Sequence, residues 1–178
     1  IALNRKIDDK ISLEIKKLFF QIIIAPGYTL KALKILKQKN ILIIKSKRNK
    51  GLYLNESKTL PGGEILQQET NNIILNNKIL KCVTNLTASK EIRSDLIFAI
   101  KVCKHVKSNA IVIAKNKQVL GIGPGQTNRL ESIKIAINNM KKNFKRKPGF
   151  VLASDGFLPF LDNIKILKGK KCISIAQP

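Results

Sequence analysis

The sequence has few of the residues that most often recognise nucleic acids. It contains no Trp and only two Tyr, and just 5 of its 34 basic residues are Arg. Arg makes bidentate contacts with phosphate and guanine, and aromatic rings stack on bases, so the scarcity of both weakens a nucleic-acid explanation for the net charge of +23. A basic nucleic-acid-binding module stays open as an alternative, and it predicts RNA binding that weakens steeply with salt.

Metal-binding residues are also scarce. A structural zinc site needs four closely spaced Cys or His ligands. The chain has a single His and three distant cysteines, Cys82, Cys103 and Cys172, with no CxxC spacing. We therefore predict no metal site. All three cysteines lie in or beside apolar stretches, which favours buried, reduced thiols in a reducing compartment.

Long apolar runs are missing as well. No segment approaches the roughly 20 apolar residues of a membrane-spanning helix, and the first residues lack the pattern of a secretory signal. We expect a cytoplasmic protein with no membrane partner. The chain starts with Ile1 and stops just after an apolar, strand-like run, so we also expect a fragment.

Lysine, isoleucine and asparagine are abundant instead, and together they fill 73 of the 178 positions. An AT-rich genome imposes such a bias through its codons, whatever the protein does. The charge of +23 therefore has two open explanations, mutational bias and an electrostatic role toward anionic ligands or RNA. With 44% apolar residues, the chain can build the core of one ordinary domain or two small ones.

The first part of the chain alternates helix and strand patterns. In order, these predict an amphipathic helix over Asp9–Phe20, a strand over Gln21–Ala25, a helix capped by Thr29 and closed by Asn40, and a strand over Ile41–Ile44. This order is typical of a layered α/β domain with a buried, parallel sheet.

The pattern weakens between 45 and 77, where a turn is expected at Pro61-Gly62-Gly63. We place a subdomain boundary there, which gives predicted domains at 1–78 and 79–178. Elements of the second are predicted as strands over Leu80–Thr84, Ala110–Ala114, Val119–Ile122, Val151–Ser154 and Cys172–Ala176, and helices over 90–105, 129–142 and 163–167. A hairpin-like turn at Asn116-Lys117 joins two of the strands.

Three glycines, Gly121, Gly123 and Gly125, lie between a predicted strand and a predicted helix. Glycine lets the backbone approach a ligand closely, and the amides at a helix start favour an anion. Gln126 stands where the dinucleotide fingerprint has its third glycine, so that motif is excluded. A tight structural turn and a ligand cradle both stay open.

Polar residues flank this region. Asn109 directly precedes a buried apolar strand, where its amide can bond a carboxamide or formyl group, or simply its own backbone in a turn. Arg129 lies in the first turn of a helix, where a cation is mildly disfavoured, which points to a specific role. Lys104 and His105 resemble an acid and base pair, but a lone His late in a helix is more typical of a surface residue.

The segment ASDGFLPFLD, from 153 to 162, concentrates two carboxylates and two aromatic rings after a buried strand. In open α/β sheets, ligands bind at such strand ends. An aromatic wall with a carboxylate to receive ring N–H groups suits a flat heterocycle, and a simple packed loop is the alternative.

These segments resemble the transformylase portion of the bifunctional purine biosynthesis family, which joins AICAR transformylase to IMP cyclohydrolase. The matching stretches keep the family's order and cover nearly the whole chain: IALNR, IIIAPGYTLKALKILKQKN, LPGGEILQQETNN, DLIFAIKVCKHVKSNAIVIAK, LGIGPGQTNRLES, VLASDGFLPFLDN and SIAQP. The resemblance implies transfer of a formyl group from 10-formyltetrahydrofolate to AICAR, which gives FAICAR. It also implies two layered α/β/α, cytidine deaminase-like subdomains without the deaminase zinc site.

By the same resemblance, Asn109 and Arg129 match residues that hold AICAR. Lys39, in the KQKN stretch, is a candidate for a lysine near the AICAR phosphate. Phe157 and Asp162 match the folate side, where the aromatic ring packs on the pterin and the carboxylate bonds to it. AICAR and folate are thus the implied partners.

The chain also departs from the family pattern. Gln21 stands where relatives usually carry a carboxylate, which affects local hydrogen bonding to substrate. The family's catalytic Lys-His pair lies upstream of IALNR, so Lys104-His105 is a different pair and we assign no catalytic residue in this chain. None of the matching stretches belongs to the cyclohydrolase domain, so we expect that domain to lie outside this chain. We expect the chain alone to be inactive, as a fragment of a homodimeric enzyme or as an inactive remnant of a split gene.

Overall fold

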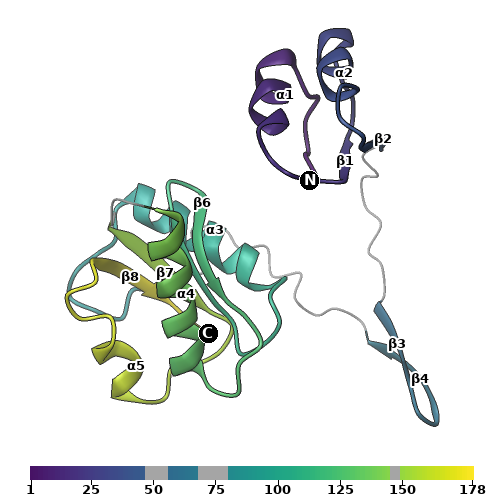
Figure 1. Cartoon of the computed structure of the whole chain (residues 1–178). Helices are drawn as coiled ribbons and strands as arrows, with labels where there is room; N and C mark the ends of the chain where they lie inside the picture. Colours follow the sequence, from purple (N-terminus) through teal and green to yellow (C-terminus); the bar gives the residue numbers. More distant parts are fainter. Residues whose placement is uncertain (47–55, 68–79, 145–148) are drawn as a thin grey trace. The chain divides into compact units, whose positions relative to one another are not determined.

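The computed structural model describes residues 1–46, 56–67, 80–144 and 149–178. The chain divides into two compact units, Ile1–Gln68 and Glu69–Pro178 (Figure 1). Each unit has a hydrophobic core of its own. The predicted boundary between 78 and 79 lies outside the described residues, and the assignment of two transformylase subdomains stays a prediction.

The first unit is built on two short parallel strands. Its elements are the helices α1 (Asp9–Lys16) and α2 (Leu30–Leu36) and the strands β1 (Ile22–Ala25) and β2 (Leu42–Lys45). The strands β1 and β2 pair in parallel, as the helix and strand alternation predicted. The Thr29 hydroxyl accepts a hydrogen bond from the Ala32 N–H at 3.1 Å, which confirms the predicted cap of α2.

One face of this small sheet carries the core of the first unit. Side chains alternate along a strand, so Ile23 and Ala25 point to the same face, where they belong to one cluster with Leu36 of α2. The opposite face is open, since Ile22 is 48% exposed and Leu42 is 58% exposed. The sheet that the sequence predicted as buried is therefore covered on one face only within this unit.

Helix α1 ends at Lys16 rather than at the predicted Phe20. The backbone N–H groups of Lys17 and Leu18 bond to carbonyls three residues back, which tightens the last turn and ends the helix. Phe19 follows this end and is 94% exposed. The apolar residues after Lys16 therefore do not extend the apolar face of α1.

A hairpin completes the described part of the first unit. Its strands are β3 (Glu56–Leu60) and β4 (Gly63–Gln67), which pair antiparallel. Gly62 lies in the connecting turn with φ of +100°, a region that favours glycine. The turn predicted at Pro61-Gly62-Gly63 is confirmed.

The second unit contains a four-stranded mixed sheet in the order β6-β5-β7-β8. Its strands are β5 (Ile111–Lys115), β6 (Gln118–Gly123), β7 (Phe150–Ser154) and β8 (Cys172–Ala176). Strand β5 runs antiparallel to both β6 and β7, and β7 runs parallel to β8. Asn116 and Lys117 have φ of 51° and 56°, and they form the predicted turn between β5 and β6.

Helices cover both faces of this sheet (Figure 1). They are α3 (Lys90–Cys103), α4 (Arg129–Asn143) and α5 (Leu161–Lys165). Along β5, Val112 packs in one core with residues of α3, whereas Ile113 packs in the other core with residues of α4, as the two-residue period of a strand requires. The predicted α/β class is thus confirmed, and the cytidine deaminase-like identity stays a prediction.

Two predictions for the start of the second unit are wrong: Leu80–Thr84 does not form a strand, and Cys82 is not buried. The Cys82 thiol instead lies within hydrogen-bond distance of the carbonyl oxygens of Thr84 and Leu86. Cys82 is exposed, whereas Cys103 is buried and Cys172 is half-buried, and all three are free thiols.

The described ranges contain no group of three or more His, Cys, Asp or Glu side chains placed to hold a metal ion. Within the same ranges, no helix is both long and apolar enough to cross a membrane.

Candidate functional site

Polar side chains gather at one edge of the sheet of the second unit. Ile111, the first residue of β5, pairs with Gly123 at the end of β6 and with Ser154 at the end of β7. The segments that precede β5 and that follow β6 and β7 therefore emerge side by side. They carry Asn109, Arg129 and Asp155.

Asn109 is held at this edge through both its backbone and its side chain. Its Nδ2 donates to the Gln126 carbonyl oxygen at 2.8 Å, and its backbone N donates to the same oxygen at 3.3 Å. The Asn109 carbonyl oxygen accepts from the buried Ser132 hydroxyl at 2.8 Å, which ties it to helix α4. Among the described residues nothing donates to Oδ1 of Asn109, so this oxygen is available to a ligand.

Arg129 forms an ion pair with Asp155. Nη2 of Arg129 lies 3.5 Å from Oδ1 of Asp155, and the two side chains are 24% and 17% exposed. The same carboxylate oxygen accepts the Ala110 N–H at 3.0 Å. A cation in the first turn of a helix opposes the helix dipole, and the carboxylate beside it offsets that cost.

The glycines of the turn serve the fold. A Cβ on Gly121 would lie 2.1 Å from the Ala136 carbonyl oxygen, and one on Gly123 would lie 1.8 Å from the Ser132 carbonyl oxygen. Helix α4 therefore packs so closely on β6 that a side chain has no room. Gly125 has φ of +63°, which also favours glycine. Of the two explanations left open for this turn, these contacts favour the tight structural turn.

The segment after β7 carries the two residues predicted on the folate side. Phe157 is 61% exposed, and Asp162 is exposed in the first turn of α5. Between them, the Leu158 N–H donates to the side-chain oxygen of Gln177 at 2.8 Å, which ties this loop to the residues after β8. Both predicted side chains are therefore accessible to a ligand from a loop that is anchored at its middle.

Lys39 and Gln21 belong to the first unit. The Lys39 ammonium donates to the Leu18 carbonyl oxygen at 2.5 Å and lies 5.2 Å from the centre of the Phe20 ring. Gln21 is exposed just before β1, and its carbonyl accepts the Leu42 N–H at 2.8 Å. Lys39 thus has partners within its own unit, and its place near a phosphate stays a prediction.

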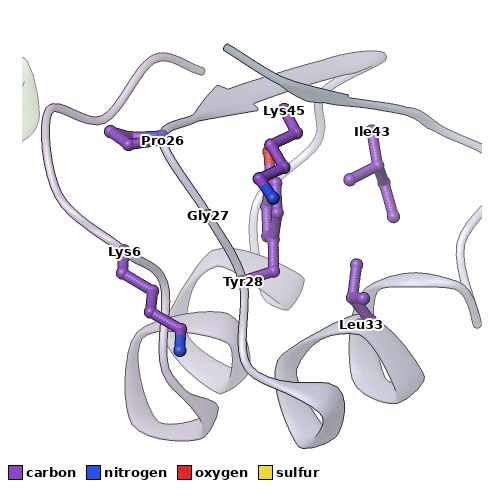
Figure 2. Close-up of a pocket in the computed structure, with 7 residues that line it drawn as sticks. All are labelled: Lys6, Pro26, Gly27, Tyr28, Leu33, Ile43 and Lys45. Carbon is purple, nitrogen blue, oxygen red and sulfur yellow. The ribbon is translucent and has the colours of Figure 1, made fainter. Parts of the chain in front are cut away.

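A pocket of about 470 Å³ lies in the first unit (Figure 2). Its lining residues are Lys6, Pro26, Gly27, Tyr28, Leu33, Ile43 and Lys45. The Tyr28 hydroxyl lies 2.8 Å from the Ile44 carbonyl oxygen, so its polar end bonds to the backbone of β2. Neither Lys39 nor Gln21 is among the lining residues.

The end of α3 lies beside the sheet edge that carries Asn109. His105 is exposed after the helix, whereas Cys103 is buried. Burial, together with the negative charge of Asp155, raises the pKa of the Cys103 thiol to about 12, and the positive charge of Arg129 acts in the opposite direction. The thiol is therefore protonated at neutral pH, which makes it a packing group rather than a nucleophile.

Three residues that organise this edge were not predicted as site residues: Gln126, Ser132 and Asp155. Asp155 had a signal in the sequence, because it is the carboxylate that directly follows the buried strand in the segment from 153 to 162. Ser132 had none, since its bond to Asn109 depends on how closely α4 approaches the sheet.

Comparisons with known proteins agree with the motif order. The family model described as the AICARFT/IMPCHase bienzyme matches residues 1–139. The bifunctional purine biosynthesis protein PurH of Acetivibrio thermocellus is 47% identical over 184 residues, covering 100% of this chain and 35% of the relative. The PurH proteins of Ruminiclostridium cellulolyticum and Petrotoga mobilis are 41% and 43% identical, again over the whole chain, which spans 35% and 34% of their lengths. The chain therefore belongs to the AICARFT/IMPCHase bienzyme family.

Proposed function

We propose that this chain is part of an AICAR transformylase, which transfers a formyl group from 10-formyltetrahydrofolate to AICAR in purine biosynthesis. The observation that carries the proposal is the convergence of Asn109 and Arg129 at one sheet edge. Ala110, next to Asn109, donates to the carboxylate that pairs with Arg129. Family membership supports the proposed reaction, and this geometry supports a binding place for one substrate.

The two residues offer complementary groups to AICAR. Oδ1 of Asn109 is a hydrogen-bond acceptor, and the guanidinium of Arg129 is a cationic donor. AICAR carries an anionic phosphate as well as amine and carboxamide groups, so it can use both. On the neighbouring loop, Phe157 offers an aromatic face to the pterin of the folate, and Asp162 offers a carboxylate to its ring N–H groups. Lys39 is proposed near the phosphate.

In the proposed reaction the 5-amino nitrogen of AICAR attacks the formyl carbon. A new N–C bond forms, the bond between that carbon and N10 of the folate breaks, and the amine loses a proton to a base while N10 gains one. The family's Lys-His pair, which serves as that base, has no counterpart assigned in this chain. We therefore propose that the chain binds substrates without turning them over by itself.

The first test is a formyl-transfer assay on the 178-residue chain, in which the release of tetrahydrofolate is measured over time. We expect no turnover above the buffer rate. Measurable turnover with AICAR would show that the chain contains its own base, which would contradict this part of the proposal.

The second test restores the missing segments in a chimera. This chain replaces the matching 35% of the Acetivibrio thermocellus relative, so that the relative supplies the remainder. In an active chimera, Asn109→Ala and Arg129→Ala should each lower kcat/KM for AICAR by about 100-fold, because each removes a bond to the reacting substrate. His105→Ala, on the exposed turn after α3, is the control and should change it by less than about twofold. Equal losses at all three positions would count against the assignment.

A further inference from the structure

The position of Arg129 calls for a residue that orients it. It is the first residue of α4, where the helix dipole disfavours a cation. Its Nε is buried and has no hydrogen-bond partner among the described residues. The backbone and Nε therefore do not set the direction of the guanidinium, and the contacts of its Nη2 atom must do so.

Asp155 supplies such a contact from a fixed position. Its backbone N–H donates to the Ala110 carbonyl oxygen at 3.2 Å, and its Oδ1 accepts the Ala110 N–H at 3.0 Å. This pair of bonds fixes both the backbone and the carboxylate of Asp155 against the segment before β5. Oδ1 lies 3.5 Å from Nη2 of Arg129, so the fixed position of this carboxylate determines the direction in which the guanidinium is attracted.

Gly156 provides the space for the guanidinium. A Cβ at this position would lie 2.0 Å from Nη2 and 2.8 Å from Cζ of Arg129. Its φ lies outside the region that favours glycine, so the absence of a side chain serves the neighbouring arginine rather than the backbone. The guanidinium therefore lies directly against the Gly156 backbone, beside the loop that carries Phe157.

We infer that Asp155 and Gly156 are positioning residues, which fix the guanidinium of Arg129 in the orientation in which it meets AICAR. Asp155 attracts the guanidinium, and Gly156 leaves the space that the guanidinium occupies. Neither residue touches AICAR in this arrangement. The inference rests on the proposed function for its ligand, and its geometric part concerns Arg129 alone.

The test uses the full 178-residue chain and the variant Asp155→Asn. Its amide oxygen can still accept the Ala110 N–H, but it carries no charge to attract Arg129. Removing a negative charge raises the net charge, so a purely electrostatic effect would strengthen the binding of anionic AICAR. We expect the opposite, an AICAR Kd about tenfold higher by calorimetry, because a misplaced guanidinium loses its bond to the ligand. Glu131→Gln is the control, because it removes one negative charge from α4, the helix that carries Arg129. Glu131 pairs with exposed Lys134, and its replacement should leave the Kd within about twofold.

Gly156→Ala tests the same inference without a change in charge. The atoms that the new methyl group would meet are at the flexible end of Arg129, so the guanidinium moves while the fold is kept. We expect an AICAR Kd about tenfold higher here too, with a melting temperature close to that of the wild type.

The Nε–H signal of Arg129 in the NMR spectrum supplies a readout that needs no ligand. The chain has five Arg residues, and the signal of Arg129 is assigned by its loss in Arg129→Lys. It should shift in Asp155→Asn and in Gly156→Ala and stay in place in Glu131→Gln. An unchanged signal in the first two variants, or equal AICAR binding by Asp155→Asn and wild type, would overturn the inference. A wild-type chain that takes up no AICAR would count against the AICAR site, and the Arg129 signal would then decide the positioning role by itself.

Discussion

Strands β1 and β5 have nearly the same sequence and very different surroundings. Ile22–Ala25 reads IIIA, and the first four residues of β5 read IVIA. All four of the latter are buried, whereas Ile22 is 48% exposed. The difference comes from neighbours: β5 lies between β6 and β7 with helices on both faces, whereas β1 pairs with one strand, β2, and has an isolated bridge between Ile24 and Ala2 on its other edge. An apolar run shows that a strand can be buried, and the topology decides whether it is.

The same contrast explains where a rigid site can be built. The residues around Asn109 and Arg129 flank strands that are packed on both faces, so their backbone positions are fixed by two cores. Lys39 follows a seven-residue helix in a unit with one core. A ligand held by the sheet edge of the second unit meets preorganised groups, whereas Lys39 depends on contacts with Leu18 and Phe20.

The largest effect on the difference between the two units is expected from Gly123→Ala, which should separate α4 from β6 in the second unit. The added Cβ would lie 1.8 Å from a backbone oxygen of α4, which cannot rotate away, so the helix must move off the sheet. We expect the free energy of unfolding of the second unit to fall by about 3 kcal/mol or more. Hydrogen exchange with peptide resolution measures this separately for the two units.

Gly27→Ala in the first unit is the matched control. Its Cβ would lie 3.5 Å from Cγ of Lys6, an ordinary contact, and we expect a change within about 0.5 kcal/mol. If Gly27→Ala accelerated exchange more than Gly123→Ala did, the close approach of α4 to β6 would not be the tightest constraint in the molecule.

The three cysteines allow buried and exposed side chains to be compared within the second unit. Bonds to the backbone and hydroxyl of Thr84 lower the pKa of exposed Cys82, whereas burial raises the pKa of Cys103 and of Cys172 to about 12. At pH 8 we expect one thiol per chain to react quickly with a disulfide reagent and two to react at least about 100-fold more slowly. Cys82→Ser should abolish the fast reaction. A second fast thiol in that variant would show that the core opens readily.

The same pKa values predict how stability depends on pH. In the unfolded chain Cys103 and Cys172 titrate near their ordinary value of 9.0, and in the folded chain near 12. Folding therefore favours the protonated thiols, so their contribution is complete below pH 9 and is lost as the pH rises toward 12. Unfolding by urea at pH 8 and pH 11 measures the loss, and replacing both residues by Ala should reduce this dependence.

Much of the fold was predictable because its local signals are strong. Thr29 caps its helix as predicted, and Asn116-Lys117 forms the turn between β5 and β6. The segment Leu80–Thr84 was predicted wrongly, because its apolar residues suit a strand but none of the described strands pairs with it. How many faces of a sheet are covered depends on contacts between segments that are distant in the sequence, so no local sequence pattern predicts it.

Two residues of the candidate site could be picked out from the sequence, but their arrangement could not. Asn109 and Arg129 stand out in the sequence, since one precedes an apolar strand and the other is a rare arginine at a helix start. Their joint position depends on the antiparallel pairing of β5 with both β6 and β7. The hairpin-like turn predicted the pairing with β6, but no sequence signal specified the pairing with β7. Asp155 and Gly156 acquire their roles only when Arg129 folds back onto them.

The smallest expected effects come from the helix caps. Thr29→Ala removes the bond to the Ala32 N–H at the start of α2, and Ser89→Ala removes the bond to the Ile92 N–H at the start of α3. Each loses about 1 kcal/mol locally, but the consequence should differ between the units. Helix α2 has seven residues, so all its amides should exchange about fivefold faster in Thr29→Ala.

In Ser89→Ala the acceleration should stay within the first turn of α3. This helix has 14 residues, and its later part packs in a core with β5 and β7 through Leu96, Ala99 and Cys103, so the lost cap does not lower the cost of opening there. Hydrogen exchange resolved along α3 measures how far the effect spreads. Faster exchange as far as Cys103 would mean that α3 opens as one piece, and that the second face of the sheet does not stabilise it as this structure implies.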